Sequence, residues 1–577
     1  MLDPVRTAGS PLVVGVSGHR NLDPSCIPRL AQQVRDFLEY LKGRLPQTEI
    51  RIMTGMAQGA DLLVAELALQ AGLQIDAMLP MPLDEYLVDF DAESAVTLRT
   101  FLGNERVHWS ELRCPASRPA VARDALYANL SETLIDKSSL LLALWDGQAS
   151  PLPAGTADTV LRYLSARTHD GSSEREIVMV PAASEPVWGE HFVYWIPTPR
   201  INDTSASERA PSYLTFIGEN LLAVHESTPP GLDQQIAGLN AYNAEFESLC
   251  AGPDARSIDS LMAALPQAAE LAHDPSLELM DTEYGKADAL AIYNQKLSDR
   301  LFLSFSWMAF AMASVFLVAE LMNSGVLLYV YLTILVASLG MFYWIRGHQW
   351  FAKHLIYRVL AETMRTKFFL RVAGADRMVN AAELMNLAGI SQFSGFGWIG
   401  TILKNVRPLD KQPGAHASLD AKLLAFVHER WIRGQQSYFK TRVRKLEHTH
   451  RRLEVMKRWL IYTIALLALA LVVFQAPLRS HRLGLVSLEQ ICIFLMGLLP
   501  VWLGIWELYQ NKMATRELLW QYRNQLSHFS RAEAQLTRSS TQHPDSSILA
   551  EVGKESLMES YLWTIHRYHR EHEPPAS

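Results

Sequence analysis

Four stretches of the chain, near residues 301–322, 325–345, 459–478 and 487–508, are almost entirely apolar. The hydrocarbon core of a bilayer is about 30 Å thick and is crossed by a helix of about 20 apolar residues, so each stretch has the length of one span. The alternative is a set of four buried helices in a water-soluble core. The near absence of charge and the pairing of the stretches across short loops favour membrane spans. We therefore predict an all-α membrane domain with four transmembrane helices in two hairpins.

The connection between the two predicted hairpins is long and basic. Just before the third span it carries Arg442, Arg444, Lys445, Arg451, Arg452, Lys457 and Arg458. Segments rich in Lys and Arg stay on the cytoplasmic side of a membrane, although Arg479 and Arg482 in the opposite loop weaken the asymmetry. We expect no cleaved signal peptide, because no charged start followed by an apolar stretch begins the chain. An even number of crossings then places both termini in the cytoplasm.

The overall charge argues against a nucleic-acid partner. The formal net charge is −7 and the isoelectric point is near 6.2, whereas domains that bind DNA or RNA through phosphates are basic. The cysteines are Cys26, Cys114, Cys250 and Cys492, and this separation excludes the close spacing of zinc ligands and redox pairs. We expect no metal site and no resident cofactor.

The N-terminal half alternates apolar, strand-like runs with helical patterns. The predicted strands are Leu12–Ser17, Glu49–Met53, Gln74–Leu79, Ser139–Leu144, Glu176–Val180 and Phe192–Ile196. Strands that alternate with helices form a mostly parallel sheet with both faces covered. The sequence therefore predicts an α/β fold, in which a Rossmann-like N-terminal domain precedes the membrane domain.

Small-residue turns with glycine accompany three of these strands, around Gly18, Gly55 and Gly155. In such sheets a ligand binds beyond the carboxyl ends of the strands. Glycine lets the backbone approach a ligand closely, and a helix beginning at about Ala60 would direct its N–H groups and positive dipole end toward an anion. Arg20 can bind a phosphate through two parallel hydrogen bonds. Together these features predict a phosphate-bearing ligand.

The candidate ligand-binding residues are Gly15, Ser17, Gly18, His19, Arg20, Thr54, Gly55, Met56, Ala57, Gly59, Ala60, Asp61, Trp145, Asp146, Gly147, Gly155, Thr156 and Arg200. Three of them have a structural alternative. Asp61 either caps its helix or binds a ribose hydroxyl. His19 either contacts phosphate or shapes the turn, and Asp146 either hydrogen-bonds a sugar or ends its strand.

The turns Ser17–Arg20 and Thr54–Asp61 resemble those of the SLOG superfamily. Leu144–Gly147 and Gly155–Ala157 resemble a later pair of motifs of that group, with Ala154 in place of a glycine. The resemblance covers roughly residues 10–200. The superfamily includes the LOG nucleotide phosphoribohydrolases, DNA-processing proteins and sensor domains fused to bacterial conflict effectors. The resemblance implies a domain that binds a nucleotide.

The C-terminal half resembles the SLATT type of membrane effector. The resemblance rests on Asp288–Ala291, on Arg358 and Glu362 in the helix after the first hairpin, and on the paired spans. It implies a bacterial inner-membrane protein of antiphage defence, which opens a pore or disrupts the membrane when its sensor is occupied. The implied partners are the lipid bilayer, further copies of the chain in a homo-oligomer, and a nucleotide-derived second messenger, either a cyclic oligonucleotide or an ADP-ribose derivative.

An enzymatic function is the alternative. The LOG enzymes carry a glutamate after their glycine turn, whereas this chain has Asp158 nearby but out of register. Because a general acid must reach the proton it transfers, we expect no catalytic residue here. The alternative function is a membrane-anchored nucleotide hydrolase that cleaves an N-glycosidic bond. A DNA-processing type of single-strand binder would need a basic, aromatic groove, which the acidic balance disfavours.

The predicted division follows the order of the chain. It comprises a SLOG-like domain over 1–225, a helical linker over 226–300, a hairpin over 301–346, a cytoplasmic basic helical region over 347–457, a second hairpin over 458–510 and C-terminal helices over 511–577.

Overall fold

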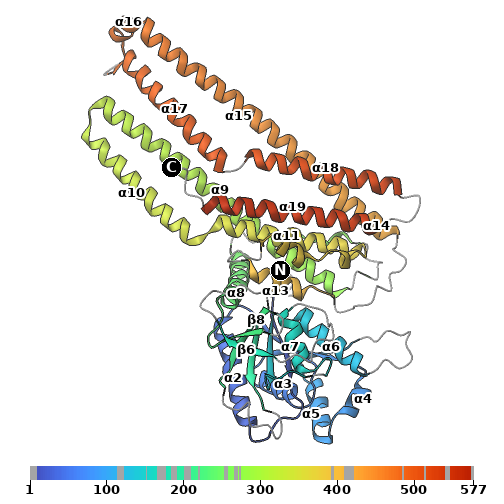
Figure 1. The fold of residues 1–577 in the computed structure, drawn as a ribbon. Coiled ribbons are helices and arrows are strands. Elements are labelled where there is room, and N and C mark those ends of the chain that lie inside the picture. Colours follow the sequence, from blue (N-terminus) through green and yellow to red (C-terminus); the bar gives the residue numbers. More distant parts are fainter. Residues whose placement is uncertain are drawn as a thin grey trace. The chain divides into compact units, whose positions relative to one another are not determined.

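The computed structural model describes residues 9–112, 123–150, 152–165, 177–182, 191–199, 209–218, 221–252, 258–265, 271, 274–390, 396–408, 421–483, 486–512, 515–539 and 546–572 (Figure 1). Contacts divide the chain into two compact units. The sheet unit comprises Met1–Ser257, Glu270–Glu283 and Asn380–Ser418, and the helical unit comprises Ile258–Ala269, Tyr284–Val379 and Leu419–Ser577. The grouping departs from chain order, because a segment from between the two predicted hairpins belongs with the sheet.

The sheet unit is built on a mostly parallel sheet, as predicted. Its strands are β1 (Leu12–Gly18), β2 (Ile50–Thr54), β3 (Gln74–Leu79), β4 (Val107–Glu111), β5 (Leu140–Trp145), β6 (Val178–Pro181), β7 (Val193–Pro197), β8 (Ser212–Gly218) and β9 (Leu221–His225). Within the described residues the order is β4-β3-β2-β1-β5-β7-β8-β9-β6. Neighbouring strands are parallel except at β7–β8 and β8–β9. The prediction missed β4, which is largely exposed, and the antiparallel hairpin β8–β9.

The chain reverses its direction across the sheet between β1 and β5. Strands β2, β3 and β4 extend the sheet on one side of β1, and β5 pairs with β1 on the other side. Both faces of the central strands are buried: Val14 and Val16 are fully covered on one face, and Val13 is nearly so on the other. A reversal point of this kind leaves a crevice at the carboxyl ends of the two strands, which is where ligands of open α/β sheets bind.

The helices of the sheet unit come from distant parts of the chain. They include α2 (Ile27–Arg44), α3 (Ala60–Gln70), α5 (Ala92–Leu102), α6 (Arg123–Lys137), α7 (Thr156–Ser165), α8 (Pro230–Ala251), α12 (Ala381–Leu387) and α13 (Gly397–Asn405). Helix α13 packs against α8, where the Tyr242 ring stacks on Trp398 with centroids 4.8 Å apart. Gly238 makes this approach possible, because a Cβ there would lie 2.4 Å from the Trp398 ring.

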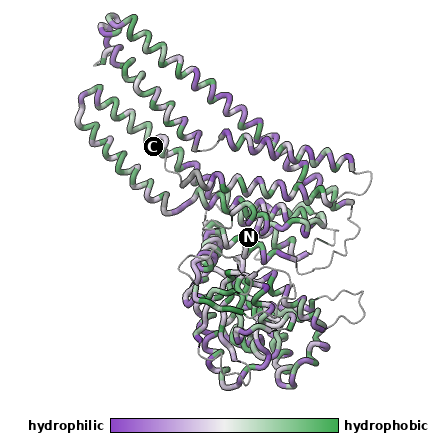
Figure 2. The backbone as a smooth tube through the Cα atoms, in the orientation of Figure 1, coloured by the Kyte–Doolittle hydropathy of each residue, from purple (hydrophilic) through white to green (hydrophobic). Residues whose placement is uncertain are grey.

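The helical unit contains the predicted spans. They belong to α9 (Pro275–Met322), whose residues up to 283 group with the sheet, and to α10 (Gly325–His348), α15 (Gly434–Val473) and α17 (Leu488–Lys512). The most apolar windows have mean hydropathies of 2.0, 2.1, 1.8 and 2.0, and none of their residues is buried. Figure 2 shows these helices as long hydrophobic runs. They are therefore long and apolar enough to cross a membrane, and their exposure excludes a buried core of a soluble protein within the described residues.

The third span is interrupted earlier than predicted. Helix α15 ends at Val473, and the short helix α16 (Gln475–Ser480) continues the chain. Pro477 explains the break, because it lacks the N–H that would bond the Val473 carbonyl in a continuous helix. From Trp459 to Val473 the helix rises about 21 Å, so crossing a hydrocarbon core of about 30 Å would also require α16.

Charged residues of α9 and of the helix after the first hairpin meet in the helical unit. Helix α11 (Trp350–Val372) contacts the part of α9 that precedes the first span, where the His354 Nδ1 lies 3.0 Å from the Ala291 carbonyl oxygen. Arg358 of α11 pairs with Asp288 of α9 at 3.1 Å and with Glu362 at 2.6 Å. Arg365 also pairs with Glu362. Burial would raise the pKa of Glu362, but the charges of Arg365 and Arg358 lower it below its ordinary value. This unit also contains α14 (Ala421–Val427), α18 (Thr515–Ser539) and α19 (Ser546–His572).

Candidate ligand pocket

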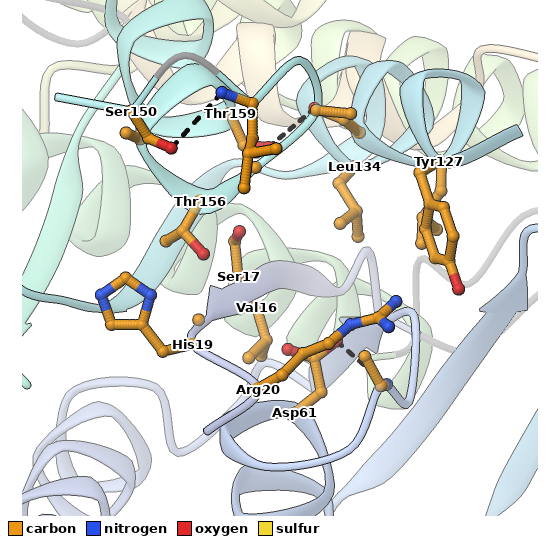
Figure 3. Close-up of a pocket in the computed structure, with 18 of the residues that line it drawn as sticks. Val16, Ser17, His19, Arg20, Asp61, Tyr127, Leu134, Ser150, Thr156 and Thr159 are labelled. Atoms are coloured by element: carbon orange, nitrogen blue, oxygen red, sulfur yellow. Dashed lines mark hydrogen bonds between the residues drawn. The ribbon is translucent and has the colours of Figure 1, made fainter. Parts of the chain in front are cut away.

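A cavity of about 470 Å³ lies at the carboxyl ends of β1 and β5, at the reversal point of the sheet. Its lining is Val16, Ser17, Gly18, His19, Arg20, Asn21, Ala57, Asp61, Tyr127, Leu130, Ser131, Leu134, Ser150, Leu152, Ala154, Gly155, Thr156, Ala157 and Thr159. The end of β1, the start of α3, one face of α6 and the start of α7 therefore enclose one space. Figure 3 shows Ser17 and Thr156 near its centre, with Arg20 and Tyr127 toward one side.

Arg20 supplies the positive charge of the cavity. Its guanidinium carbon lies 4.9 Å from the centre of the Tyr127 ring, and the Tyr127 hydroxyl donates to Asp89. Burial alone would lower the pKa of Arg20, but the hydrogen bond and charge of Tyr127, together with Tyr86 and Asp89, raise it above its ordinary value. Arg20 is therefore a permanent cation held by an aromatic ring, with the fork geometry that suits a phosphate.

Hydroxyl groups and a helix start face the cavity opposite Arg20. Ser17 is the next-to-last residue of β1, and Thr156 begins α7. The first N–H groups of a helix have no acceptor within it, so the beginning of α7 directs donors and a positive dipole end toward this space. The Ser131 and Thr159 hydroxyls bond each other at 2.8 Å and join α6 to α7. This wall offers neutral donors to an anion.

The turn before α3 is held mainly by internal hydrogen bonds. Asp61 Oδ2 accepts from the Thr54 hydroxyl at 2.9 Å and from the Ala57 N–H at 3.4 Å. The Ala60 N–H donates to the His19 carbonyl at 3.1 Å, so it joins the two turns and is not directed at a ligand. Gly59 has a φ of +91°, and a Cβ there would lie 2.1 Å from the Arg20 carbonyl oxygen. This turn therefore positions Arg20, and Asp61 serves the turn and not a distant group.

Asp61 is the one buried carboxyl group that both lines the cavity and has a strongly shifted pKa among the described residues. Burial raises its pKa to about 6, against the lowering effect of the bonds from Thr54 and Ala57 and of the charge of Arg20. Asp61 therefore changes its charge inside the cavity near pH 6. An anionic ligand would favour the protonated form, because like charges repel.

The turn after β5 is structural. The Asp146 N–H donates to Nε2 of His19 at 3.1 Å, which fixes the His19 ring against this turn. Asp146 Oδ1 accepts from the Gln148 N–H at 3.0 Å. Trp145 is fully buried, and its backbone carbonyl accepts from the Trp195 ring nitrogen at 2.8 Å. His19 and Asp146 therefore shape the turn, and only the His19 ring also reaches the cavity wall.

The structure brings together eight of the predicted site residues: Ser17, Gly18, His19, Arg20, Ala57, Asp61, Gly155 and Thr156 line the cavity. The other described candidates lie behind it: Gly15, Thr54, Gly55, Met56, Gly59, Ala60, Trp145, Asp146 and Gly147 are not among the lining residues. Gly15 and Gly55 lie behind the wall for packing reasons, since a Cβ would lie 2.1 Å from Ser138 Oγ and 2.5 Å from Leu130 Cδ2, respectively. Arg200 lies outside the described residues.

Sequence reasoning missed the contribution of α6. Tyr127, Leu130, Ser131 and Leu134 line the cavity from one face of this helix. Their spacing of three and four residues was a readable sign of one helical face. Nothing in that spacing indicated that the face borders a ligand cavity and not an apolar core.

Asp158, the acidic residue nearest the LOG-type glutamate position, does not line the cavity. Its carboxylate accepts from the Ala154 N–H at 2.9 Å and lies 3.7 Å from Arg162. These contacts hold the turn before α7. Among the described residues, no group of three or more potential ligands is placed to hold a metal ion.

No family model matches the chain, and no curated protein is detectably similar to it in sequence.

Proposed function

We propose that the chain is a membrane effector whose sheet unit senses a nucleotide-derived messenger and whose apolar helices then open a pore or disrupt the membrane. The setting that this function suits is bacterial antiphage defence at the inner membrane, with both termini in the cytoplasm. The proposal joins a cavity that contains a cation and hydroxyl groups with four membrane-compatible helices in one polypeptide.

The chemistry of the cavity supports a nucleotide as ligand. Its volume of about 470 Å³ lies within the range of about 300–1,000 Å³ that is typical of small-molecule sites. Arg20 and the beginning of α7 suit phosphate oxygens, and the hydroxyls of Ser17 and Thr156 suit the remaining oxygens. The apolar side chains Leu130 and Leu134 offer a surface for a base. The same chemistry accommodates a cyclic dinucleotide or an ADP-ribose derivative.

The observation that best supports a sensor function is that α13 belongs to the sheet unit. This helix lies in sequence between the two hairpins, yet its C-terminal end is bound to the sheet unit. The Lys137 ammonium donates to the carbonyl of Asn405 at 3.1 Å and to that of Arg407. Arg407 pairs with Asp136 at 3.3 Å, and Lys404 donates to the Ser138 carbonyl at 2.8 Å. A purely enzymatic domain on a membrane anchor would have no need of this attachment.

Helix α6 links this attachment to the cavity. Tyr127 and Ser131 lie on the part of α6 that lines the cavity, and Lys137 is its last residue, about 9 Å beyond Ser131 along the helix. A ligand that binds one position of α6 more tightly favours that position. The chain on either side of α13 leads to α11, which follows the first hairpin, and to α15, which enters the second. A shift of α6 would thus move α13, which the covalent chain joins to both hairpins.

Pore formation calls for several copies of the chain. Four helices of one chain rarely enclose a channel, whereas a ring of identical subunits does so with one repeated interface. We therefore propose a homo-oligomer with closed symmetry as the active form.

The test uses the full chain, because a fragment over 1–225 would lack α8 and α13 of the sheet unit. Cyclic di-AMP, cyclic GMP–AMP, cyclic ADP-ribose and ADP-ribose are each added to the purified chain in detergent and to dye-loaded vesicles that contain it. We expect one probe to raise the melting temperature and to release dye. Arg20→Gln should lose both effects, and Arg99→Gln, an exposed matched control, should lose neither.

A second variant separates sensing from transmission. Lys137→Met should retain the ligand-dependent rise in melting temperature but reduce dye release, because it removes two bonds from α6 to the end of α13 and leaves only the Asp136–Arg407 ion pair of the α6 contacts described above. Conversion of a nucleoside monophosphate into free base by the wild type, without dye release, would overturn the proposal in favour of the hydrolase.

A further inference from the structure

One side of α15 carries an unpaired basic stripe directly before the third span. Arg444, Lys445, Arg451, Arg452 and Arg458 are all exposed, as is His448. At 100° per residue these positions fall on one side of the helix. Among the described residues, none of the five Lys and Arg side chains takes part in an ion pair with an acidic side chain.

The other side of α15 is packed, and the two acidic residues of this helix lie between that side and the stripe. Phe439 stacks against Phe529 of α18 with ring centroids 5.9 Å apart. Glu447 pairs with Arg523 at 2.6 Å, and Glu454 lies 3.7 Å from Lys457. Both acidic groups of this helix are therefore paired with basic residues outside the stripe, and the basic stripe is left without an internal counterion.

The stripe continues in line into an apolar one. Val455, Trp459, Tyr462, Leu466 and Leu469 follow at helical spacings of three and four, and they are 39%, 68%, 64%, 66% and 60% exposed. Because α15 is unbroken from Gly434 to Val473, charge and apolar surface form one continuous band. Trp459 stands between them, and Trp is enriched at the level of the lipid headgroups.

We infer that this band binds anionic phospholipids, with the phosphate at Arg451, Arg452 and Arg458 and the acyl chains along the apolar part. This inference rests on the proposed crossing of the membrane by α15. A band that is cationic and then apolar matches an amphiphile with an anionic head. A nucleic acid would leave the apolar part uncovered, and a second parallel copy of α15 would place like charges against each other.

Distance along the helix predicts which residues matter most. Arg451 and Arg452 lie about 10–12 Å before Trp459, whereas Arg444 and Lys445 lie about 21–23 Å before it. The attraction of a charged membrane surface falls off over about 10 Å in physiological salt. Each basic residue near the surface changes the affinity about fivefold, so removal of Arg451, Arg452 and Arg458 should weaken lipid binding by at least about tenfold.

The test measures which lipids stay with the full chain. The protein is inserted into vesicles of equal parts phosphatidylglycerol and phosphatidylcholine, extracted in mild detergent, and its bound lipid is quantified by mass spectrometry. We expect enrichment of phosphatidylglycerol in the wild type and its loss in R451Q/R452Q/R458Q. The lysine variant R451K/R452K/R458K should retain it, as should R35Q/R99Q/R106Q, which removes as much charge from exposed sites of the sheet unit.

Equal lipid ratios in the wild type and the glutamine variant would overturn the inference. So would competition of DNA with phosphatidylglycerol for the stripe, or cross-linking of Arg451→Cys to the same position of a second copy. Resistance to alkaline extraction is measured on the same vesicles. A chain that resists extraction but shows no enrichment refutes the lipid inference alone, whereas a chain that is extracted refutes the membrane crossing itself.

Discussion

Replacement of Asp61 by asparagine should stabilise the sheet unit at neutral and basic pH. Burial raises the pKa of Asp61 from an ordinary 3.8 to about 6. The folded state therefore holds this proton more tightly than the unfolded state. The contribution of protonated Asp61 to the free energy of unfolding is fully present below pH 3.8 and is lost as the pH rises through 6.

The magnitude follows from the two pKa values. Each pH unit between them is worth about 1.4 kcal/mol, so ionised Asp61 costs up to about 3 kcal/mol at pH 8. Asparagine avoids this cost, and its carbonyl oxygen can still accept from the Thr54 hydroxyl and the Ala57 N–H. The gain should therefore be close to zero at pH 4 and approach about 3 kcal/mol above pH 7.

Pulse proteolysis of the full chain in detergent and urea measures this difference. The urea midpoint for cleavage within the sheet unit is determined for wild type and Asp61→Asn at several values between pH 4 and pH 8. Asp84→Asn, at an exposed position, should follow the wild-type profile. A variant that is less stable than the wild type at pH 8, or a difference that does not change with pH, would refute the reasoning.

Three further substitutions test one turn and two electrostatic interactions. Gly59→Ala should lower the unfolding free energy of the sheet unit by at least about 2 kcal/mol, because Gly59 has a positive φ and a Cβ there would clash with the backbone. Gly43→Ala is the control, since Gly43 has open space around it, and it should be neutral or stabilising in the same urea titration. Glu362→Gln should lower the unfolding free energy of the helical unit by about 2–3 kcal/mol at pH 7, because two arginines lose their shared charged partner. Faster amide exchange in α11 would show this loss, and unchanged exchange would contradict it. Lys404→Met should raise the pKa of His191, because burial and then the charge of Lys404 hold that pKa well below its ordinary value. The pH dependence of hydrogen exchange at the His191 ring carbon measures the shift. Burial should still keep the pKa of His191 below 6.5 in the variant.

Local patterns were enough to predict the main elements. The apolar runs at Leu12–Gly18 and Leu140–Trp145 became adjacent central strands, because a strand buried on both faces must be continuously apolar. The four apolar stretches became long exposed helices for a similarly local reason, since hydropathy and length alone decide whether a helix can cross a bilayer. Strand β4 was missed because its exposed, polar residues carry no such pattern.

The candidate site was predicted only in part. Ser17, Arg20 and Thr156 could be placed from the sequence because they lie close to the ends of elements at the carboxyl edge of the sheet. The sequence could not distinguish these three residues from Gly15 or Trp145, which lie behind the cavity wall and pack against neighbouring elements. Which side of a turn faces a cavity depends on neighbouring elements, and sequence spacing does not contain that information.

What the sequence determined by itself was the kind of each element: a parallel sheet with small-residue turns, and helices apolar enough for a membrane. These properties are set within a few turns of the chain. Only the tertiary structure decided that α6 forms a wall of the cavity and that α13, from between the two hairpins, is bound to the sheet unit. The physical reason is that Lys137 and the end of α13 are about 270 residues apart in sequence, and a contact at such a separation depends on the packing of every element between them.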